Sequence, residues 1–215
     1  MAQIIVAGKR VKELIQKKII SAKDSQATSV GDYTFYNCKV LTTADFPLAT
    51  SVGDYAFYSC SKLTTVNSPL ITRIGHHAFC NCKVLATADF PLVTSIGANA
   101  FYMCSKLTTM DYPLITSIGN YAFYNCTNLT ALILRNTDNV CTLSNTNAFT
   151  STPIKSGTGY IYVPSALVAD YQKATNWLTY SAQFRALEDY TVDGTITGAL
   201  DPEKISTTTT EEVSE

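Results

Sequence analysis

The chain has 215 residues, of which 46% are hydrophobic and 15% are charged, so it is long enough to bury one substantial core. No apolar run approaches the ~20 residues that a membrane-spanning helix needs, which argues against membrane insertion. The net charge of −1 hides an asymmetry, because residues 1–28 carry six Lys or Arg and two acids, whereas residues 186–215 carry eight acids and one Lys. A basic end can bind nucleic acid, but this one has no aromatic residues between its charges, which favours a solvated surface and no nucleic-acid partner.

The first segment, residues 1–28, contains the sequence KRVKELIQKKII, in which four apolar residues keep helical spacing: Val11, Leu14, Ile15 and Ile19. We predict an N-terminal helix that caps the open end of the array that follows. A signal peptide is the competing interpretation, but the apolar start at residues 4–7 is short and the basic residues come after it. Without an export signal the cellular location stays open: we expect synthesis in the cytoplasm, with association with a virion or delivery to the cell surface by another route as alternatives.

From residue 29, a segment of 22 residues recurs five times, each copy reading roughly S-(V/I)-G-x-x-A-F-x-x-C-x-x-L-T-T-x-x-x-P-L-x-T. The copies begin at Ser29, Ser51, Arg73, Ser95 and Ser117. The Phe column holds Phe35, Phe57, Phe79, Phe101 and Phe123, and the Cys column holds Cys38, Cys60, Cys82, Cys104 and Cys126. Such columns predict a solenoid, because one copy cannot bury its own apolar face. The regular copies span residues 29–138, and a degenerate sixth copy with the run GYIYVP extends the predicted solenoid to residue 164.

Within each copy, the segment Leu-Thr-Thr-x-x-x fits the strand-bearing pattern L-x-x-L-x-L of a leucine-rich repeat. The predicted inward positions are Leu63, Val66 and Ser68 in the second copy and Leu107, Met110 and Tyr112 in the fourth. The following Pro favours the end of the strand because it has no amide donor, and we expect the next Leu to turn back into the core. These leucines are Leu48, Leu70, Leu92 and Leu114. The recurring Gly, such as Gly53, is placed where a tight bend or a positive φ costs least.

After the solenoid, Ser165 is a candidate cap for a helix in which Leu167, Tyr171, Ala174 and Leu178 recur on one side, beside Trp177. We predict that residues 165–188 form a helix that covers the C-terminal end of the array. Residues 189–215 are acidic and rich in Thr, with too few apolar residues to offset the entropy of ordering, which predicts a flexible tail.

The motif G-x-x-A-F-x-x-C-x-x-L, followed by Pro and (V/I)-T-S-I-G, resembles the BspA-type leucine-rich repeats over residues 29–138 and, more loosely, in the degenerate copy. Repeats of this kind occur in surface and secreted proteins of gut and oral bacteria, in some protozoa and in phage-associated proteins. The resemblance implies an α/β repeat solenoid, a right-handed superhelix of 22-residue coils with a parallel sheet on one face and short helical or irregular segments on the other. It also implies a non-enzymatic adhesion module that binds a protein or a glycan, with a structural component of a phage or cell-surface assembly as an alternative.

Seven Cys residues raise the question of disulfides or a metal. Side chains in one column point the same way rather than at each other, so we expect free, buried thiols that fill the core beside the Phe column. The third copy supports a competing hypothesis, a metal-binding or catalytic site of His76, His77 and Cys80, because it holds both His of the chain. A surface substitution is the simpler interpretation of the His pair, and Cys80, outside the column, is expected to react with thiol reagents. No nucleophile–base pair can be assembled from the sequence, so neither an enzyme nor a cofactor is predicted.

The outward positions of the predicted strands carry acid and amide groups flanked by hydroxyls. This ladder consists of Asp45, Asn67, Asp89 and Asp111, and the flanking column consists of Thr43, Thr65, Thr87 and Thr109. We predict that the ladder accepts hydrogen bonds from a basic peptide or from a sugar, and the alternative is a merely solubilising face. The ladder ends at Ile133, which would be a partner contact if it is exposed.

A second candidate surface carries seven tyrosines around the Ala-Phe segments. They are Tyr33, Tyr36, Tyr55, Tyr58, Tyr102, Tyr121 and Tyr124. Tyrosine is common at recognition surfaces, but these rings would serve structure alone if they pack on one another along the solenoid.

Overall fold

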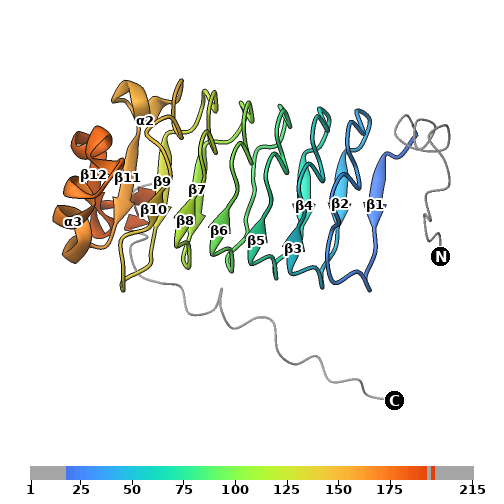
Figure 1. Cartoon of the computed structure of the whole chain (residues 1–215), viewed down its shortest axis with the longest axis horizontal. Coiled ribbons are helices and arrows are strands. Elements are labelled where there is room, and N and C mark those ends of the chain that lie inside the picture. The colour runs from blue at the N-terminus through green and yellow to red at the C-terminus, as the bar shows by residue number, and fades with distance from the viewer. Residues whose placement is uncertain (1–17, 193–194, 197–215) are drawn as a thin grey trace, which may run out of the picture.

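The coils of the chain stack side by side along one axis (Figure 1). The computed structural model describes residues 18–192 together with residues 195 and 196. The helix predicted within residues 1–28 therefore falls mainly outside the described residues, as does the predicted tail beyond residue 196. The described part of the first segment contains strand β1 (Ser21–Lys23), which adds a coil before the first regular copy.

One side of the coils carries strands that pair in parallel. The first sheet contains β1, β2 (Thr43–Asp45) and β4 (Thr65–Asn67). Beyond the third copy, the second set contains β7 (Thr109–Tyr112), β9 (Ala131–Leu134), β11 (Tyr160–Val163) and β12 (Phe184–Ala186). Ser21 faces Thr43, and Thr43 faces Thr65, so the register advances by one copy per strand. We call the outward side of these strands the strand face.

The inward positions of these strands are buried as predicted. Leu63 and Leu107 are fully buried, Val66 and Met110 lie beneath the sheet, and Ser68 and Tyr112 occupy the same position in their coils. The Ser68 hydroxyl donates to the carbonyl of Asn67, whereas the Tyr112 hydroxyl is buried without a hydrogen-bond partner among the described residues. The handedness of the superhelix stays a prediction.

A further parallel sheet runs along another side of the coils. Its strands are β3 (Ser51–Val52), β5 (Arg73–Ile74), β6 (Ser95–Ile96), β8 (Ser117–Ile118) and β10 (Thr142–Leu143), in that spatial order. A glycine follows each of the first four strands, and a Cβ on Gly75 would lie 2.6 Å from the carbonyl carbon of Gly53. Among the described glycines, only Gly157 has a positive φ. The close approach of neighbouring coils, rather than a left-handed conformation, therefore requires the recurring glycine.

The third side of each coil is a run of turns around the Ala-Phe pair. We call it the turn face, which comprises residues 32–37, 54–59, 76–81, 98–103 and 120–125. Two residues per coil are left-handed, as in Tyr55 with φ 56° and Ser59 with φ 58°. The N–H of Phe57 donates to the carbonyl of Ala78 at 2.8 Å, and the equivalent bond recurs at each step from Phe35 to Phe123. Backbone hydrogen bonds thus join neighbouring coils on this side as well.

The core consists of aromatic rings and thiols in register. The rings of Phe35, Phe57, Phe79, Phe101, Phe123 and Phe149 form one continuous stack with centroid separations of 5.2–5.5 Å. All seven cysteines are free and buried, as predicted for the column. Each column thiol from Cys60 to Cys126 donates to the carbonyl of a Phe in the preceding coil at 3.0–3.2 Å. Cys80 is only 6% exposed, so the prediction of a reactive thiol there was wrong.

The leucine that follows each proline does not turn into the core as predicted. Leu48 and Leu114 are each 45% exposed, and Leu70 and Leu92 are half-buried. The next residue along is fully buried in each case: Ala49, Ile71, Val93 and Ile115. The N–H of Ala49 donates to the carbonyl of Phe46 at 3.0 Å, so Pro and Leu form the two corner positions of a turn and point outward.

The C-terminal cover is more irregular than the single helix predicted over residues 165–188. It contains η1 (Ser165–Leu167), α3 (Val168–Lys173), η2 (Trp177–Gln183), β12 and η3 (Leu187–Asp189), after the short helix α2 (Pro153–Ser156). Asn176 adopts a left-handed φ of 65°, which breaks the predicted helix. Trp177 and Tyr180 nevertheless cover the end of the Phe stack, with centroids 5.9 and 5.4 Å from that of Phe149.

The strands β13 (Thr191–Val192) and β14 (Thr195–Ile196) follow the cover and pair with each other in antiparallel fashion. No helix within the described residues is long and apolar enough to cross a membrane.

Candidate binding surface

The eight ligand-binding residues predicted from the sequence lie on the strand face. The inner column holds Thr43, Thr65, Thr87 and Thr109, and all four are exposed. The outer column holds Asp45, Asn67, Asp89 and Asp111, of which Asn67 and Asp89 are exposed and the other two are half-buried. Residues 87–89 form no strand but keep the same alternation of exposed and buried side chains. The repeat period alone therefore brings these eight side chains to one surface.

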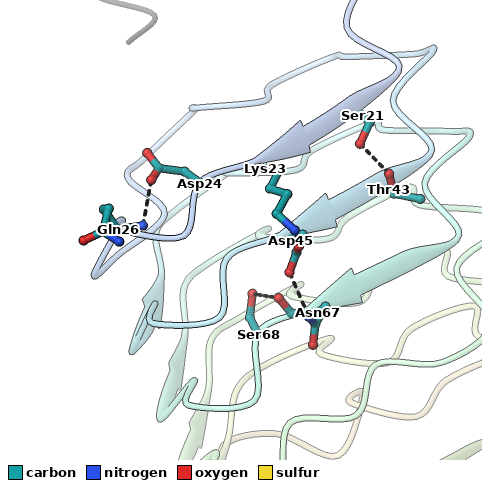
Figure 2. A network of polar contacts seen from close by, with 8 residues as sticks. All are labelled: Ser21, Lys23, Asp24, Gln26, Thr43, Asp45, Asn67 and Ser68. Carbon is teal, nitrogen blue, oxygen red and sulfur yellow. Dashed lines mark hydrogen bonds and ion pairs between the residues drawn. The ribbon is translucent and has the colours of Figure 1, made fainter. Parts of the chain in front are cut away.

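Asp45 is already paired within the protein (Figure 2). The ammonium of Lys23 lies 2.9 Å from one carboxylate oxygen, and the amide of Asn67 donates to the other oxygen at 2.7 Å. These two hydrogen bonds, from Lys23 and then from Asn67, lower the pKa of Asp45. The Thr43 hydroxyl donates to that of Ser21 at 2.8 Å, so this end of the strand face is an internally satisfied polar network.

Asp111, at the other end of the ladder, is held by Arg135. The guanidinium donates from Nε to Oδ1 at 2.9 Å and from Nη2 to Oδ2 at 2.8 Å, a two-pronged pairing. The side chain of Arg135 is only 10% exposed. Ile133 is 1% exposed, so it is not the exposed partner contact that the sequence left open.

Asp89 is the exception in the ladder. It lies between Asn67 and Asp111 in the outer column, its side chain is exposed, and it has no hydrogen bond or ion pair within the described part of the chain. The hydroxyls of Thr65, Thr87 and Thr109 lie in the adjacent column. An unpaired carboxylate beside hydroxyls can accept hydrogen bonds from an amide, an ammonium or a sugar hydroxyl.

The strand face ends in an aromatic group that the sequence reasoning missed. Tyr160 pairs with Ala131 and Tyr162 with Ile133, so both tyrosines continue the two outward columns. The guanidinium of Arg185 lies 4.2 Å from the ring centroid of Tyr160, and Tyr190 meets Tyr162 edge-on at 4.6 Å. The alternating sequence GYIYVP indicates a strand with tyrosines on one side. Because this copy departs from the repeat, the sequence does not show which columns the two tyrosines continue.

The tyrosines of the turn face pack mainly on one another. Tyr33 stacks on Tyr55 at 4.9 Å, Tyr36 on Tyr58 at 5.0 Å, and Tyr102 on Tyr124 at 4.8 Å. The interplanar angles of these pairs are 3–7°. Each ring thus covers one face of its neighbour, which is the structural alternative stated for this surface.

The three residues of the metal or catalytic hypothesis serve different structural purposes. His76 Nδ1 accepts from the N–H of Ala98 at 3.0 Å, His77 stacks on Tyr55 at 4.5 Å, and Cys80 is buried. Burial lowers the pKa of His77, with a smaller contribution from His76. Among the described residues, no group of three or more His, Cys, Asp or Glu is arranged to hold a metal ion.

Two open depressions lie away from the strand face. One, of about 370 Å³, is lined by Arg73, His76, Ser95, Asn120 and their neighbours along the sheet that contains β5, β6 and β8. The other, of about 360 Å³, lies between β10 and the C-terminal cover. Neither is lined by a residue of the predicted ladder.

Comparison with known proteins places this geometry among repeat proteins. The chain matches the family described as BspA type Leucine rich repeat region, in six copies over residues 16–70 and 50–163. It is similar to a leucine-rich repeat protein of T. pallidum, with 27% identity and a TM-score of 0.52 over 55% of this chain and 60% of that protein. It is also similar to a leucine-rich cell surface protein from Faecalibacterium prausnitzii A2-165, with 26% identity and a TM-score of 0.52 over 70% of this chain and 45% of that protein.

The chain thus spans less than two thirds of the length of either protein. No match is found among curated proteins.

Proposed function

Because the chain belongs to the BspA-type leucine-rich repeat family, we propose that it is a binding module that holds an extended protein or glycan ligand on its strand face. The observation that carries this proposal is the unpaired, exposed carboxylate of Asp89 at the centre of a column whose other carboxylates are internally paired. Repeats that present similar groups at each step suit a ligand that lies along several coils. The F. prausnitzii neighbour, described as a cell surface protein, agrees with a role in adhesion.

The charge of the strand face is smaller than the ladder suggests. Lys23 neutralises Asp45 and Arg135 neutralises Asp111, which leaves one uncompensated negative charge at Asp89. The geometry therefore favours a ligand that brings one cation or a few hydrogen-bond donors to the centre, rather than a polybasic ligand. The exposed hydroxyls of Thr65, Thr87 and Thr109 would hydrogen-bond such a ligand and fix its register along the coils.

The aromatic end of the strand face adds contact area of a different kind. Tyr160, Tyr162 and Arg185 are half-buried, and Tyr and Arg are enriched among the residues that dominate binding energies. A ligand that reaches from Asp89 to Tyr162 would meet a polar centre and then an aromatic anchor. For a glycan, the exposed part of the Tyr162 ring offers a stacking surface.

The test is a charge reversal at the centre of the strand face. Partners are captured with the wild type, quantified by mass spectrometry, and the affinity of the recovered ligand is then measured for Asp89→Lys and for the control Asp170→Lys. Asp170 is an exposed carboxylate on α3, away from the strand face. We expect Asp89→Lys to weaken binding by at least tenfold, about 1.4 kcal/mol, with no change for the control. Equal affinities in the two folded variants would remove the strand face from the proposal.

A further inference from the structure

Exposed lysines recur in five successive coils, from the coil of β1 to the fourth regular copy, in the loop that precedes the strand position. They are Lys18, Lys39, Lys62, Lys83 and Lys106, and all five are exposed. Their positions alternate, since Lys39 and Lys83 directly follow a column cysteine while Lys62 and Lys106 come one residue later. Lys18 lies 22 residues before Val40 and so extends the alternation to the coil of β1. We call this zigzag row the lysine ridge.

Charges in the repeats are sorted by position. Residues 29–130 contain five basic residues, of which four belong to the lysine ridge, and five acidic residues, of which none does. The acids lie on the strand face, as Asp89 does, or beside the glycine column, as Asp32 and Asp54 do. The ion pairs within the described residues are Lys23–Asp45 and Arg135–Asp111, so no ridge lysine is neutralised there. A surface that served solubility alone would gain from interspersing both signs, which lowers repulsion between like charges.

The backbone under the ridge is ordered by bonds between coils. The Ser105 hydroxyl donates to the carbonyl of Lys83 at 3.3 Å, and the amide of Asn128 donates to the carbonyl of Ser105 at 2.7 Å. Neighbouring coils are about 4.8 Å apart where their strands pair. The backbone therefore presents the exposed ridge lysines at the repeat of the coils.

We propose that the lysine ridge binds a linear anionic polysaccharide, with sulfate or carboxylate groups on successive sugars meeting successive lysines. A pyranose ring is about as long as one step between coils, so the zigzag offers a cation to alternate sides of such a polymer. The ridge lies in the loops just before the strands, as Lys62 does before β4, and not on the strand face. None of its lysines belongs to the groups proposed to bind the ligand of Asp89. The interaction is therefore separate from the proposed function and can fail or succeed independently.

The residues around the ridge favour a polysaccharide over a nucleic acid. Single-stranded nucleic acids are held by bases stacked on aromatic faces, but the rings that shortly precede the ridge lysines in sequence, such as Tyr36 and Tyr58, stack face to face on each other. The ridge also contains only lysines, which act as point charges, and none of the arginines that recognise phosphate with two parallel hydrogen bonds. The residues between the lysines are small or aliphatic, such as Val40 and Ser61.

The experiment measures binding of the whole protein to fluorescent dodecasaccharides of heparin and of hyaluronate as a function of salt. The double variant Lys62→Gln/Lys83→Gln is compared with Arg73→Gln/Lys173→Gln, which removes two exposed positive charges from other surfaces. We expect the ridge variant to lose at least tenfold in affinity. Its affinity should also depend less steeply on salt, because a complex with fewer lysine contacts releases fewer counterions when it forms. The control should lose less than twofold, and both variants should keep the melting temperature of the wild type.

Three other outcomes overturn the proposal, and one identifies the recognised group. Equal losses in the two double variants would mean that net charge alone attracts the polymer. No binding of either dodecasaccharide at low salt would remove the ridge as a site, whereas tighter binding of one of them assigns sulfate or carboxylate as the recognised group. A single-stranded DNA oligonucleotide with the same number of charges, bound as tightly and with the same loss in the ridge variant, would overturn the assignment to polysaccharides.

Discussion

Replacing Ala98 with Asp is expected to stabilise the protein, because the change would extend a row of hydrogen bonds that ends at this residue. The carboxylate of Asp32 accepts from the N–H of Asp54 at 2.7 Å, and that of Asp54 accepts from the N–H of His76 at 2.7 Å. His76 Nδ1 then accepts from the N–H of Ala98 at 3.0 Å. Ala98 has no acceptor to offer, and within the described residues the N–H of Asn120 has no hydrogen bond.

The expected gain follows from one hydrogen bond and the room available for it. The carboxylate of Asp54 lies 2.6 Å from the place of a Cβ on Gly75, so the glycine of the next coil provides the space for this side chain. Gly119 provides the same space beside Ala98. A net hydrogen bond contributes about 0.5–1.5 kcal/mol, and ordering a short side chain costs about 0.5 kcal/mol. We therefore expect a gain of up to about 1 kcal/mol and a rise in Tm of up to about 4 °C.

Calorimetry gives the change in Tm, and hydrogen exchange of the Asn120 amide reports the bond itself. Ala98→Asn is the matched variant, because its side-chain carbonyl can accept the same bond without a charge. Ala98→Val, which has no acceptor, should leave the exchange rate of Asn120 unchanged. The reasoning is refuted if Ala98→Asp leaves both Tm and the protection of Asn120 at their wild-type values.

Three further predictions concern stability. Phe101→Ala should lower the free energy of unfolding by about 3–5 kcal/mol. The degenerate sequence around Phe149 predicts a smaller loss for Phe149→Ala, but Phe149 is fully buried under Trp177 and Tyr180. Denaturant unfolding should therefore give similar losses for the two variants. Burial lowers the pKa of His77, so the unfolded chain takes up its proton first and stability should fall as pH drops through about 6.5; His77→Tyr should flatten this dependence, and an identical pH profile would contradict it. Tyr112→Phe removes a buried hydroxyl without a partner and should be neutral or stabilising by up to about 1 kcal/mol, so a clear loss of Tm would reveal a missing bond.

The period of the repeat made most of the fold predictable. Columns of one residue type, such as Phe and Cys, identify the inward positions without any knowledge of the turns, and the strand positions follow from the alternation beside them. The choice between two adjacent apolar residues is different. Leu70 and Ile71 are equally suited to the core, and the turn at the proline decides that Ile71 enters it. The prediction of one helix in the C-terminal cover was wrong for a similar reason. The apolar residues there keep a helical spacing, but Asn176 adopts a left-handed conformation that interrupts the helix.

The ladder shows the limit of the same method for function. Its eight residues could be placed on one surface, since they share the repeat period. Their pairing could not be predicted, because Lys23 belongs to the coil before the first regular copy and Arg135 lies 24 residues after Asp111 rather than 22. Three similar carboxylates in one column thus have different environments, and only the contacts across coils separate Asp89 from the other two.

This difference suggests where binding groups should be sought in a repeat array. A polar column that recurs can be satisfied by its own neighbours. In a second threonine column, away from the ladder, Thr72 donates to the carbonyl of Thr50 at 3.1 Å and Thr94 donates to that of Thr72 at 3.1 Å. The stacked tyrosines of the turn face satisfy one another in the same way. Groups that remain available are those that lack such a neighbour, namely Asp89 within its column and the lysine ridge, whose members repel rather than satisfy one another. Recurrence by itself therefore indicates stability, and an unsatisfied member of a recurring set indicates a contact with another molecule.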